Sequence, residues 1–339
     1  MRSIKHIIMN TKERKQIAKN IKCDPKLSEE VKSFLTEVNT RAVKRHRRRN
    51  AADERQELMR LQSAVRTDLS GIDEAEKLIE TGGYQIKLTL VRPAGNEEIL
   101  PAFIFLHGGG WVTGDYATSR RLVRDLVILS GCAAVFVHYS LSPEAVYPQA
   151  IHESYAATKW LAENGAAINV DGKSIAIVGS SSGGNLATVT AMVAREKSGP
   201  EFKLQVLLWP VVEARINRGA SRKFGEGRYL TASGIKRHFK AYVPEKKRRK
   251  EHYVSPLNAR KSDLEGLPTA LIVLAQSDVT RHSAQAYARK LARAGVPVTA
   301  VRYNGMIHDF GQINALAKLP QTQAALTQIA ATLSKYLKP

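Results

Sequence analysis

The chain has 339 residues, which is enough for one large α/β domain or two domains of ordinary size. Hydrophobic residues make up 43% and charged residues 24% of the sequence, as in soluble globular proteins, and no run of about 18 apolar residues predicts a transmembrane helix. The apolar stretch near the N-terminus, Ile7 to Met9, is too short for a secretory signal. The two cysteines, Cys23 and Cys132, exclude a disulfide framework and fit a reducing compartment, so we expect a cytoplasmic protein.

The net charge of +21 is concentrated in two segments. Residues 1–60 carry a net charge of +9 and residues 221–261 carry +10, whereas the rest of the chain carries only +2. The densest clusters are Lys44-Arg-His-Arg-Arg-Arg49 and Lys246-Lys-Arg-Arg-Lys250. Such clusters usually form solvated surface, but two of them bordering one pocket would attract anionic esters, an anionic membrane surface or a nucleic acid. They lack interleaved aromatic residues, and no nucleic-acid-binding module is visible.

Residues 1–70 have no strand pattern and are expected to be helical, with a helix beginning at Asp24-Pro25. From residue 84 onward, apolar β-branched runs alternate with longer amphipathic segments. The predicted strands are Tyr84–Arg92, Ala102–Leu106, Ala133–His138, Ser174–Val178, Lys203–Leu208, Thr269–Ala275 and Val298–Tyr303. The predicted helices are Ser119–Ser130, Ala150–Asn164, Gly184–Lys197, Arg281–Ala294 and Thr322–Leu337.

This alternation predicts the α/β class, with a mostly parallel central sheet flanked by helices. Residues 211–261, like residues 1–70, contain no convincing strand. These two segments also hold the excess positive charge. We therefore expect them to be additions to the sheet core and not independent domains.

The strongest local motif is Gly179-Ser180-Ser181-Ser182-Gly183-Gly184, between a predicted strand and a predicted helix. A nucleophile elbow needs this context, because a sharp turn flanked by small residues lifts one hydroxyl above the sheet at a helix N-terminus. The register assigns that hydroxyl to Ser181. A Gly/Ser-rich turn or a phosphate-binding loop is the alternative, although the loop lacks the Gly-Lys-Ser/Thr of nucleotide-binding proteins.

A second motif, His107-Gly108-Gly109-Gly110-Trp111, directly follows the strand Ala102–Leu106. Three glycines in succession let the backbone approach a ligand closely and point N–H groups at it. An acyl-transfer enzyme needs such donors where negative charge develops on the carbonyl oxygen of its substrate. The alternative is a flexible turn without a catalytic role.

A serine hydroxyl needs a neighbouring base, and the histidine best placed for this is His308, just after the strand Val298–Tyr303. Asp278, after the strand Thr269–Ala275, is the carboxylate expected to orient the imidazole. The chain order Ser181, Asp278, His308 is that of α/β-hydrolases. Asp309 is a rival orienting acid, but a direct neighbour in sequence rarely reaches the far nitrogen of the ring.

These motifs resemble the hormone-sensitive-lipase branch of the α/β-hydrolases, a group rich in carboxylesterases. The family pattern His-Gly-Gly-Gly is present at 107–110, and the elbow pattern Gly-Asp-Ser-Ala-Gly-Gly corresponds to 179–184. A family segment similar to Asp-Tyr-Arg-Leu-Ala-Pro-Glu corresponds to His138-Tyr-Ser-Leu-Ser-Pro-Glu144. The resemblance covers roughly residues 75–339.

The resemblance implies an α/β-hydrolase fold with Ser181, Asp278 and His308 as a catalytic triad. It also implies that the backbone N–H groups of Gly109, Gly110 and Ser182 form an oxyanion hole, with His107 and Gly108 as supporting parts of the motif. In this family a helical lid covers the site, and here it would comprise residues 1–70 and an insertion at about 211–261 of the catalytic core 71–339.

The chain departs from the family pattern around these residues. Ser180 and Ser182 replace the elbow Asp and Ala, and Asp309 replaces the Gly after the catalytic His. His138 replaces an Asp, and His282-Ser283 stand where Asp-Glu is common. None of these changes removes a member of the triad, but they alter the groups that support it.

The sequence thus predicts a serine carboxylesterase that hydrolyses short- to medium-chain esters through an acyl-enzyme and needs no metal or organic cofactor. A non-catalytic binding protein is the runner-up, because plant gibberellin receptors resemble this family but lack the catalytic histidine. Amide or peptide hydrolysis by the same triad is a third possibility. The sequence leaves open the acyl and alcohol preference, and whether the chain forms a homo-oligomer.

Overall fold

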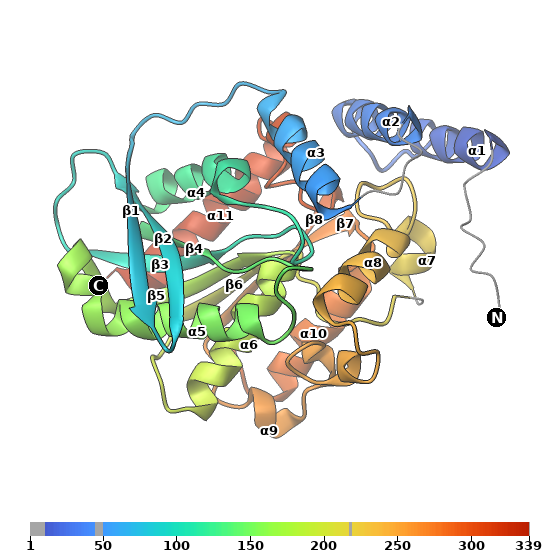
Figure 1. The fold of residues 1–339 in the computed structure, drawn as a ribbon. Helices are drawn as coiled ribbons and strands as arrows, with labels where there is room; N and C mark the ends of the chain where they lie inside the picture. The colour runs from blue at the N-terminus through green and yellow to red at the C-terminus, as the bar shows by residue number, and fades with distance from the viewer. Residues whose placement is uncertain (1–10, 45–49, 217–218, 339) are drawn as a thin grey trace.

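The computed structural model describes residues 11–44, 50–216 and 219–338. Its centre is an eight-stranded sheet in the order β1-β2-β4-β3-β5-β6-β7-β8 (Figure 1). Strand β2 is antiparallel to β1 and β4, and the other pairs are parallel. The strands are β1 Ile72–Thr81, β2 Tyr84–Pro93, β3 Leu100–Leu106, β4 Ala133–His138, β5 Val170–Ser180, β6 Leu204–Leu208, β7 Ala270–Ser277 and β8 Val298–Ile307.

Helices cover both faces of the sheet, because side chains of the central strands alternate between two apolar cores. On β3, Phe103 and Phe105 face the core beneath α4 and α11, whereas Ile104 and Leu106 face the core beneath α5, α6 and α10 (Figure 1). These five helices span α4 Tyr116–Ser130, α5 Gln149–Asn164, α6 Ser182–Glu196, α10 Arg281–Arg293 and α11 Pro320–Leu337. The predicted α/β architecture, with a mostly parallel sheet flanked by helices, is confirmed.

Each of the seven predicted strands and five predicted helices is present, with ends shifted by a few residues. Strand β1 was not predicted. The predicted helix start at Asp24-Pro25 is wrong: α1 ends at Lys22, and the next helix begins only at Glu29. Asp24 instead lies in the intervening turn, where its carboxylate accepts a hydrogen bond from the amide of Lys26 at 3.0 Å.

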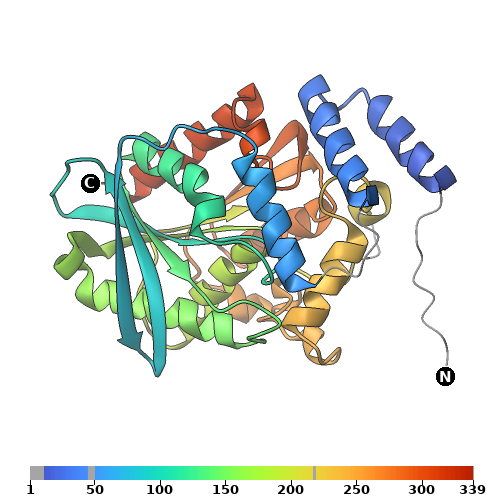
Figure 2. The same ribbon diagram turned by 45° about the horizontal axis from the view of Figure 1, so that its top comes forward.

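Where the structure describes them, the two charged segments are largely helical, and parts of both lie over the C-terminal edge of the sheet. The N-terminal segment forms α1 Thr11–Lys22, α2 Glu29–Lys44 and α3 Ala51–Ser63, and the insertion between β6 and β7 forms α7 Ala220–Phe224, α8 Ala232–Tyr242 and α9 Lys261–Leu264. Figure 2 shows α3 beside α8, on the same side of the molecule as α2. Of the two basic clusters, residues 45–49 lie outside the described residues. Among the residues that are described, no helix has the length and apolar character needed to cross a bilayer.

Candidate active site

Ser181 lies in a sharp turn between β5 and α6, at the C-terminal edge of the sheet. Its φ of +53° and ψ of −113° are rare for a residue with a side chain, and its amide donates a 2.9 Å hydrogen bond to the carbonyl of Leu208 at the end of β6. The turn requires glycine at 183, because a Cβ there would overlap the carbonyl oxygen of Leu106. The small residues at 179–184 therefore allow the backbone of the turn to approach the ends of β3 and β6 closely, as the motif predicted.

The structure brings Ser181, His308 and Asp278 together from the ends of three strands. His308 follows β8, and its Nε2 lies 2.8 Å from Oγ of Ser181. Asp278 follows β7, and its Oδ2 lies 2.8 Å from Nδ1 of His308. The other carboxylate oxygen of Asp278 accepts a 2.8 Å hydrogen bond from the amide of Thr280, which fixes its orientation. Hydroxyl, imidazole and carboxylate thus form a continuous chain of contacts in which the serine proton can pass to the ring.

The surroundings of His308 favour a basic imidazole. Burial alone lowers the pKa of His308, but the negative charges of Asp278 and Asp309, together with the hydrogen bond to Asp278, raise it above its ordinary value. Since a carboxylate oxygen only accepts hydrogen bonds, Nδ1 of His308 carries the hydrogen that it shares with Asp278. Nε2 is then the nitrogen free to accept the proton of Ser181.

Asp309 does not take the place of Asp278. Its Oδ1 lies 3.6 Å from Nε2 of His308, the nitrogen that faces Ser181, and not from Nδ1. Burial raises the pKa of the Asp309 carboxyl above its ordinary value. The carboxyl of Asp309 therefore lies beside the nitrogen that faces Ser181, whereas the contact with Nδ1 belongs to Asp278, in keeping with the ranking of the two acids.

The glycine motif after β3 folds over the elbow. The amides of Val112 and Thr113 both donate to the carbonyl of Gly109, at 3.2 and 3.0 Å, which closes the loop into a tight turn. Gly109 and Gly110 line a cavity together with Ser181. Oγ of Ser182 accepts a 3.2 Å hydrogen bond from the amide of Trp111 and so ties the loop to the elbow.

His107 supports this loop from below. Its ring stacks between Phe136 and Tyr139, with ring centroids 5.5 and 4.3 Å away. Burial lowers the pKa of His107 to about 4, so the ring is neutral at physiological pH. Nδ1 of His107 lies 2.7 Å from the carbonyl oxygen of Gly108, and a Cβ on Gly108 would press against the Ser180 side chain. These two residues therefore hold the loop against the elbow instead of facing the cavity with a reactive group.

The cavity over Ser181 and His308 has a volume of about 420 Å³. Its walls combine loops of the sheet core with side chains from both charged segments. Those from the charged segments are Val38 and Asn39 of α2, Leu58 and Gln62 of α3, Tyr229, Leu230 and Thr231 before α8, and Gly234, Ile235, Arg237 and His238 of α8. These residues could not be predicted from the sequence, because nothing in an amphipathic helix shows which turn will lie over a pocket formed elsewhere.

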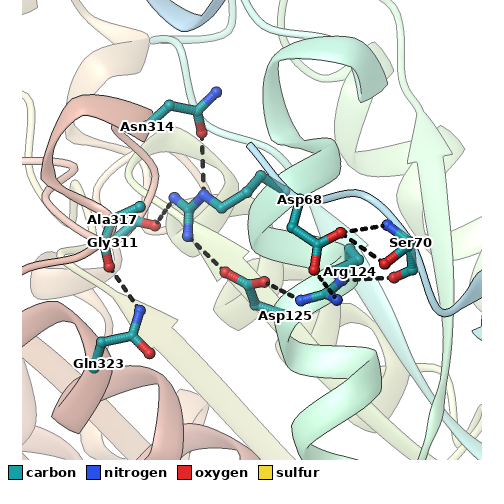
Figure 3. A network of polar contacts seen from close by, with 9 residues as sticks. Asp68, Ser70, Arg124, Asp125, Gly311, Asn314, Ala317 and Gln323 are labelled. Carbon is teal, nitrogen blue, oxygen red and sulfur yellow. Dashed lines mark hydrogen bonds and ion pairs between the residues drawn. The ribbon is translucent and has the colours of Figure 1, made fainter. Parts of the chain in front are cut away.

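A buried polar network holds the loop that follows His308. Nε of Arg121, on α4, donates to Oδ1 of Asn314 at 3.0 Å, and another guanidinium nitrogen donates to the carbonyl of Gly311. A third nitrogen pairs with Asp125 at 3.0 Å, and Arg124 pairs with the same carboxylate at 3.1 Å (Figure 3). The arrangement fixes the chain within a few residues of the imidazole of His308.

Two positions that depart from the family pattern make polar contacts away from Ser181, one with an added segment and one within the sheet. Nδ1 of His282 accepts a 2.7 Å hydrogen bond from the amide of Ala220, the first residue of α7. His138 contacts Oγ1 of Thr89 on the neighbouring strand at 2.8 Å. Neither residue contacts the three predicted catalytic residues.

The chain matches known proteins over most of its length. A family model described as alpha/beta hydrolase fold matches residues 103–312. A putative alpha/beta hydrolase of Acanthamoeba polyphaga mimivirus is 37% identical over 254 residues, which make up 75% of this chain and 73% of the relative. The ethyl acetate hydrolase of Pseudomonas putida is 30% identical over 260 residues, which make up 75% of this chain and 80% of the relative.

Among solved structures, a thermostable esterase from Pseudomonas putida ECU1011 superimposes with a TM-score of 0.90 at 44% identity. The superposition covers 93% of this chain and 99% of the esterase. Sequence motifs, fold and relatives agree: the chain belongs to the α/β-hydrolase family, in the hormone-sensitive-lipase-like branch.

Proposed function

We propose that this chain hydrolyses short- to medium-chain carboxylic esters through an acyl-enzyme formed on Ser181. That it is a carboxylic ester hydrolase follows from its family and its esterase relatives, and the proposal concerns the residues and the substrate range. The observation that carries the proposal is the contact chain Ser181–His308–Asp278, with two distances of 2.8 Å. A cavity of about 420 Å³ lies within the range of small-molecule sites, and the ethyl acetate hydrolase among the relatives acts on a short ester.

In the proposed reaction, Ser181 attacks the acyl carbonyl while Nε2 of His308 accepts its proton. The amides of Gly109, Gly110 and Ser182 stabilise the negative charge on the former carbonyl oxygen. His308 then gives the proton to the leaving alcohol. In the second step, His308 accepts a proton from a water molecule that attacks the acyl-enzyme, and it returns this proton to Ser181 as the carboxylic acid leaves.

The mechanism is tested by replacing the nucleophile. We expect Ser181→Ala to lower kcat for p-nitrophenyl butyrate by about 10³-fold or more, because the variant lacks the hydroxyl that would form the acyl-enzyme. A fluorophosphonate probe should label the parent at Ser181 and leave the variant unlabelled. A variant as active as the parent would refute the assignment.

A panel of p-nitrophenyl esters from acetate to palmitate tests the proposed substrate range. Activity should peak among the short and medium acyl chains and be lost for palmitate. A matched pair of ester and anilide then separates ester hydrolysis from amide hydrolysis by the same triad. A parent that binds small ligands but neither turns over any ester nor reacts with the probe would favour the non-catalytic alternative.

We propose in addition that residues 1–70 and 211–261 act as a lid on the catalytic core 71–339. Both segments contribute side chains to the cavity wall, which supports this division of the chain. The exposed lysines of the cluster Lys246–Lys250 would attract anionic esters or an anionic surface towards the lid. A cytoplasmic location, expected from two free cysteines, is tested by cell fractionation, and the oligomeric state by light scattering.

A further inference from the structure

Glu54, on α3, is a partly buried carboxylate that links the two added segments. Its side chain is only 11% exposed. Oε1 accepts a hydrogen bond from Nε of Arg237 at 2.9 Å, and Oε2 accepts one from Nε2 of His238 at 3.0 Å. Both donors lie on α8, which lies beside α3 (Figure 2). Burial alone would raise the pKa of Glu54. The hydrogen bonds from His238 and Arg237 and the charges of these residues outweigh that effect and lower the pKa to about 2, so the carboxylate is charged.

The other face of His238 contacts the predicted oxyanion loop. Because a carboxylate can only accept, Nε2 of His238 carries the hydrogen shared with Glu54, which orients the ring. Nδ1 is then packed against Gly110, where a Cβ would overlap it. His238 and Gly110 both line the cavity that contains Ser181.

The same helix also holds the next residue of the loop. The ring of Trp111 stacks on Tyr242 with a centroid distance of 4.4 Å and an interplanar angle of 6°. It also contacts Phe239 at 4.9 Å. Helix α8 thus contacts Gly110 and Trp111, two consecutive residues of the loop, and Glu54 on α3 orients the side chain that makes the first of these contacts.

We propose that Glu54 and His238 are positioning residues for catalysis: the carboxylate of α3 orients the imidazole of α8, and the imidazole holds Gly110 where its amide meets the oxyanion. This inference rests on the proposed function, since it assigns a role towards the oxyanion hole. It gives a reason for a charged, partly buried carboxylate to lie between two segments that could cover the cavity by apolar contacts alone. It also makes the geometry of the catalytic loop depend on both added segments being in place.

The inference is tested with Glu54→Gln, which removes the negative charge, and with two replacements of His238. Glutamine at 238 can still reach Glu54 with an amide in place of Nε2, whereas asparagine keeps a polar atom beside Gly110 but cannot reach Glu54. We expect Glu54→Gln and His238→Asn to lower kcat by about tenfold to a hundredfold, because small displacements of catalytic groups have effects of this size. KM should change less than about twofold, and His238→Gln should stay within about threefold of the parent.

Varying the length of the acyl chain distinguishes a positioning role of Glu54 and His238 from a role in the wall of the pocket. Loss of an oxyanion contact lowers kcat equally for acetate, butyrate and octanoate esters, because all three form the same oxyanion. A loss that depends on chain length, or that appears in KM, would overturn the proposal. The control is Glu265→Gln, which breaks the exposed pair of Glu265 with Lys261 and should leave the kinetics unchanged.

Hydrogen–deuterium exchange gives a second measurement that needs no ester hydrolysis. Amides at 108–113 should exchange faster in Glu54→Gln and His238→Asn than in the parent and in the control. If the parent hydrolyses esters and neither kcat nor exchange responds to these variants, the positioning role is wrong and the proposed function stands. If the parent hydrolyses no ester and exchange still responds, Glu54 and His238 hold the loop and the proposed function fails.

Discussion

At the scale of single residues, the imidazole of His308 lies between two carboxylates that contact different ring nitrogens. Asp278 contacts Nδ1 of His308 directly, whereas Asp309 lies 3.6 Å from Nε2. Both negative charges raise the pKa of His308, against the effect of burial. The base acts only when neutral, so kcat/KM falls as the pH drops through this pKa. The acid limb of the profile should therefore lie above the ordinary histidine value of 6.5.

Replacing Asp278 should change this profile in a defined direction. Asp278→Asn removes a charge that stabilises the imidazolium, so the acid limb should move to lower pH. The ring also loses its orienting acceptor, and kcat should fall by about 10⁴-fold. Asp309→Asn should likewise move the limb down but leave kcat within about tenfold of the parent, because Asp309 does not contact Nδ1. A pH–rate profile of each variant checks this, and an unchanged limb in both would contradict it.

At the scale of elements, the sequence predicted the buried strands well because their apolar runs are nearly continuous. It missed β1, Ile72–Thr81, whose only buried residue is Ile79 and whose charged side chains face solvent. Such an edge strand has no clear alternation of apolar and polar residues. The hairpin turn Gly82-Gly83, with both φ values positive, was the available signal.

The helix start at Asp24-Pro25 was misplaced because its residue types also suit a turn. The helix instead begins at Glu29, and Oγ of Ser28 accepts a hydrogen bond from the amide of Val31 at 3.3 Å, as in an N-cap. Asp24 pairs with Arg228 at 2.6 Å, a residue of the other charged segment. This contact between distant parts of the chain leaves no local pattern in the sequence.

The loop after His308 depends on α4 through Arg121, whose side chain is 5% exposed. Arg121→Met would keep the length of the side chain, but it would leave Oδ1 of Asn314 and the carbonyl of Gly311 without the donor that Arg121 provides, and it would remove one of the two arginines that pair with Asp125. Arg124 still pairs with Asp125, so the expected loss in the free energy of unfolding is about 3 kcal/mol, the lower end for a broken buried ion pair.

Urea denaturation measures the loss expected for Arg121→Met. The control is Arg60→Met, which removes an exposed partner 3.8 Å from Glu57 and should cost less than about 1 kcal/mol. Equal losses in the two variants would show that the Arg121 network does not anchor the loop.

At the scale of the whole molecule, the meeting of Ser181, Asp278 and His308 can be predicted from the sequence, whereas the side chains of the cavity wall cannot. Ser181, Asp278 and His308 each follow a strand, and parallel strands carry their C-terminal ends to one edge of the sheet. Glu54 and His238 meet although they are 184 positions apart, because two helices outside the sheet pack together. No periodicity fixes such packing, so the residues that shape the pocket emerge only from the structure.

The basic cluster 246–250 combines arginines that make structural contacts with lysines that are exposed to solvent. Within the cluster 246–250, Arg248 pairs with Glu251 at 2.9 Å and Arg249 donates to the carbonyl of Val243 at 2.8 Å, so these two arginines hold the insertion together. Lys246, Lys247 and Lys250 remain exposed in the segment that carries a net +10. Their field should raise the encounter rate with an anionic ester, and salt should screen it within about 10 Å at 0.1 M.

We therefore expect kcat/KM for a p-nitrophenyl ester of a dicarboxylic acid to fall about threefold to tenfold between low and high salt. The neutral butyrate ester should show no such fall, because it carries no charge for the field to act on. Replacing the three lysines by glutamine should flatten the response to the acidic ester. Lys173→Gln, at the opposite end of β5 from Ser181, should leave it unchanged. Since the encounter rate is what the field changes, kcat should stay constant throughout, and a flat kcat/KM for both esters would show that the basic surface does not attract the substrate.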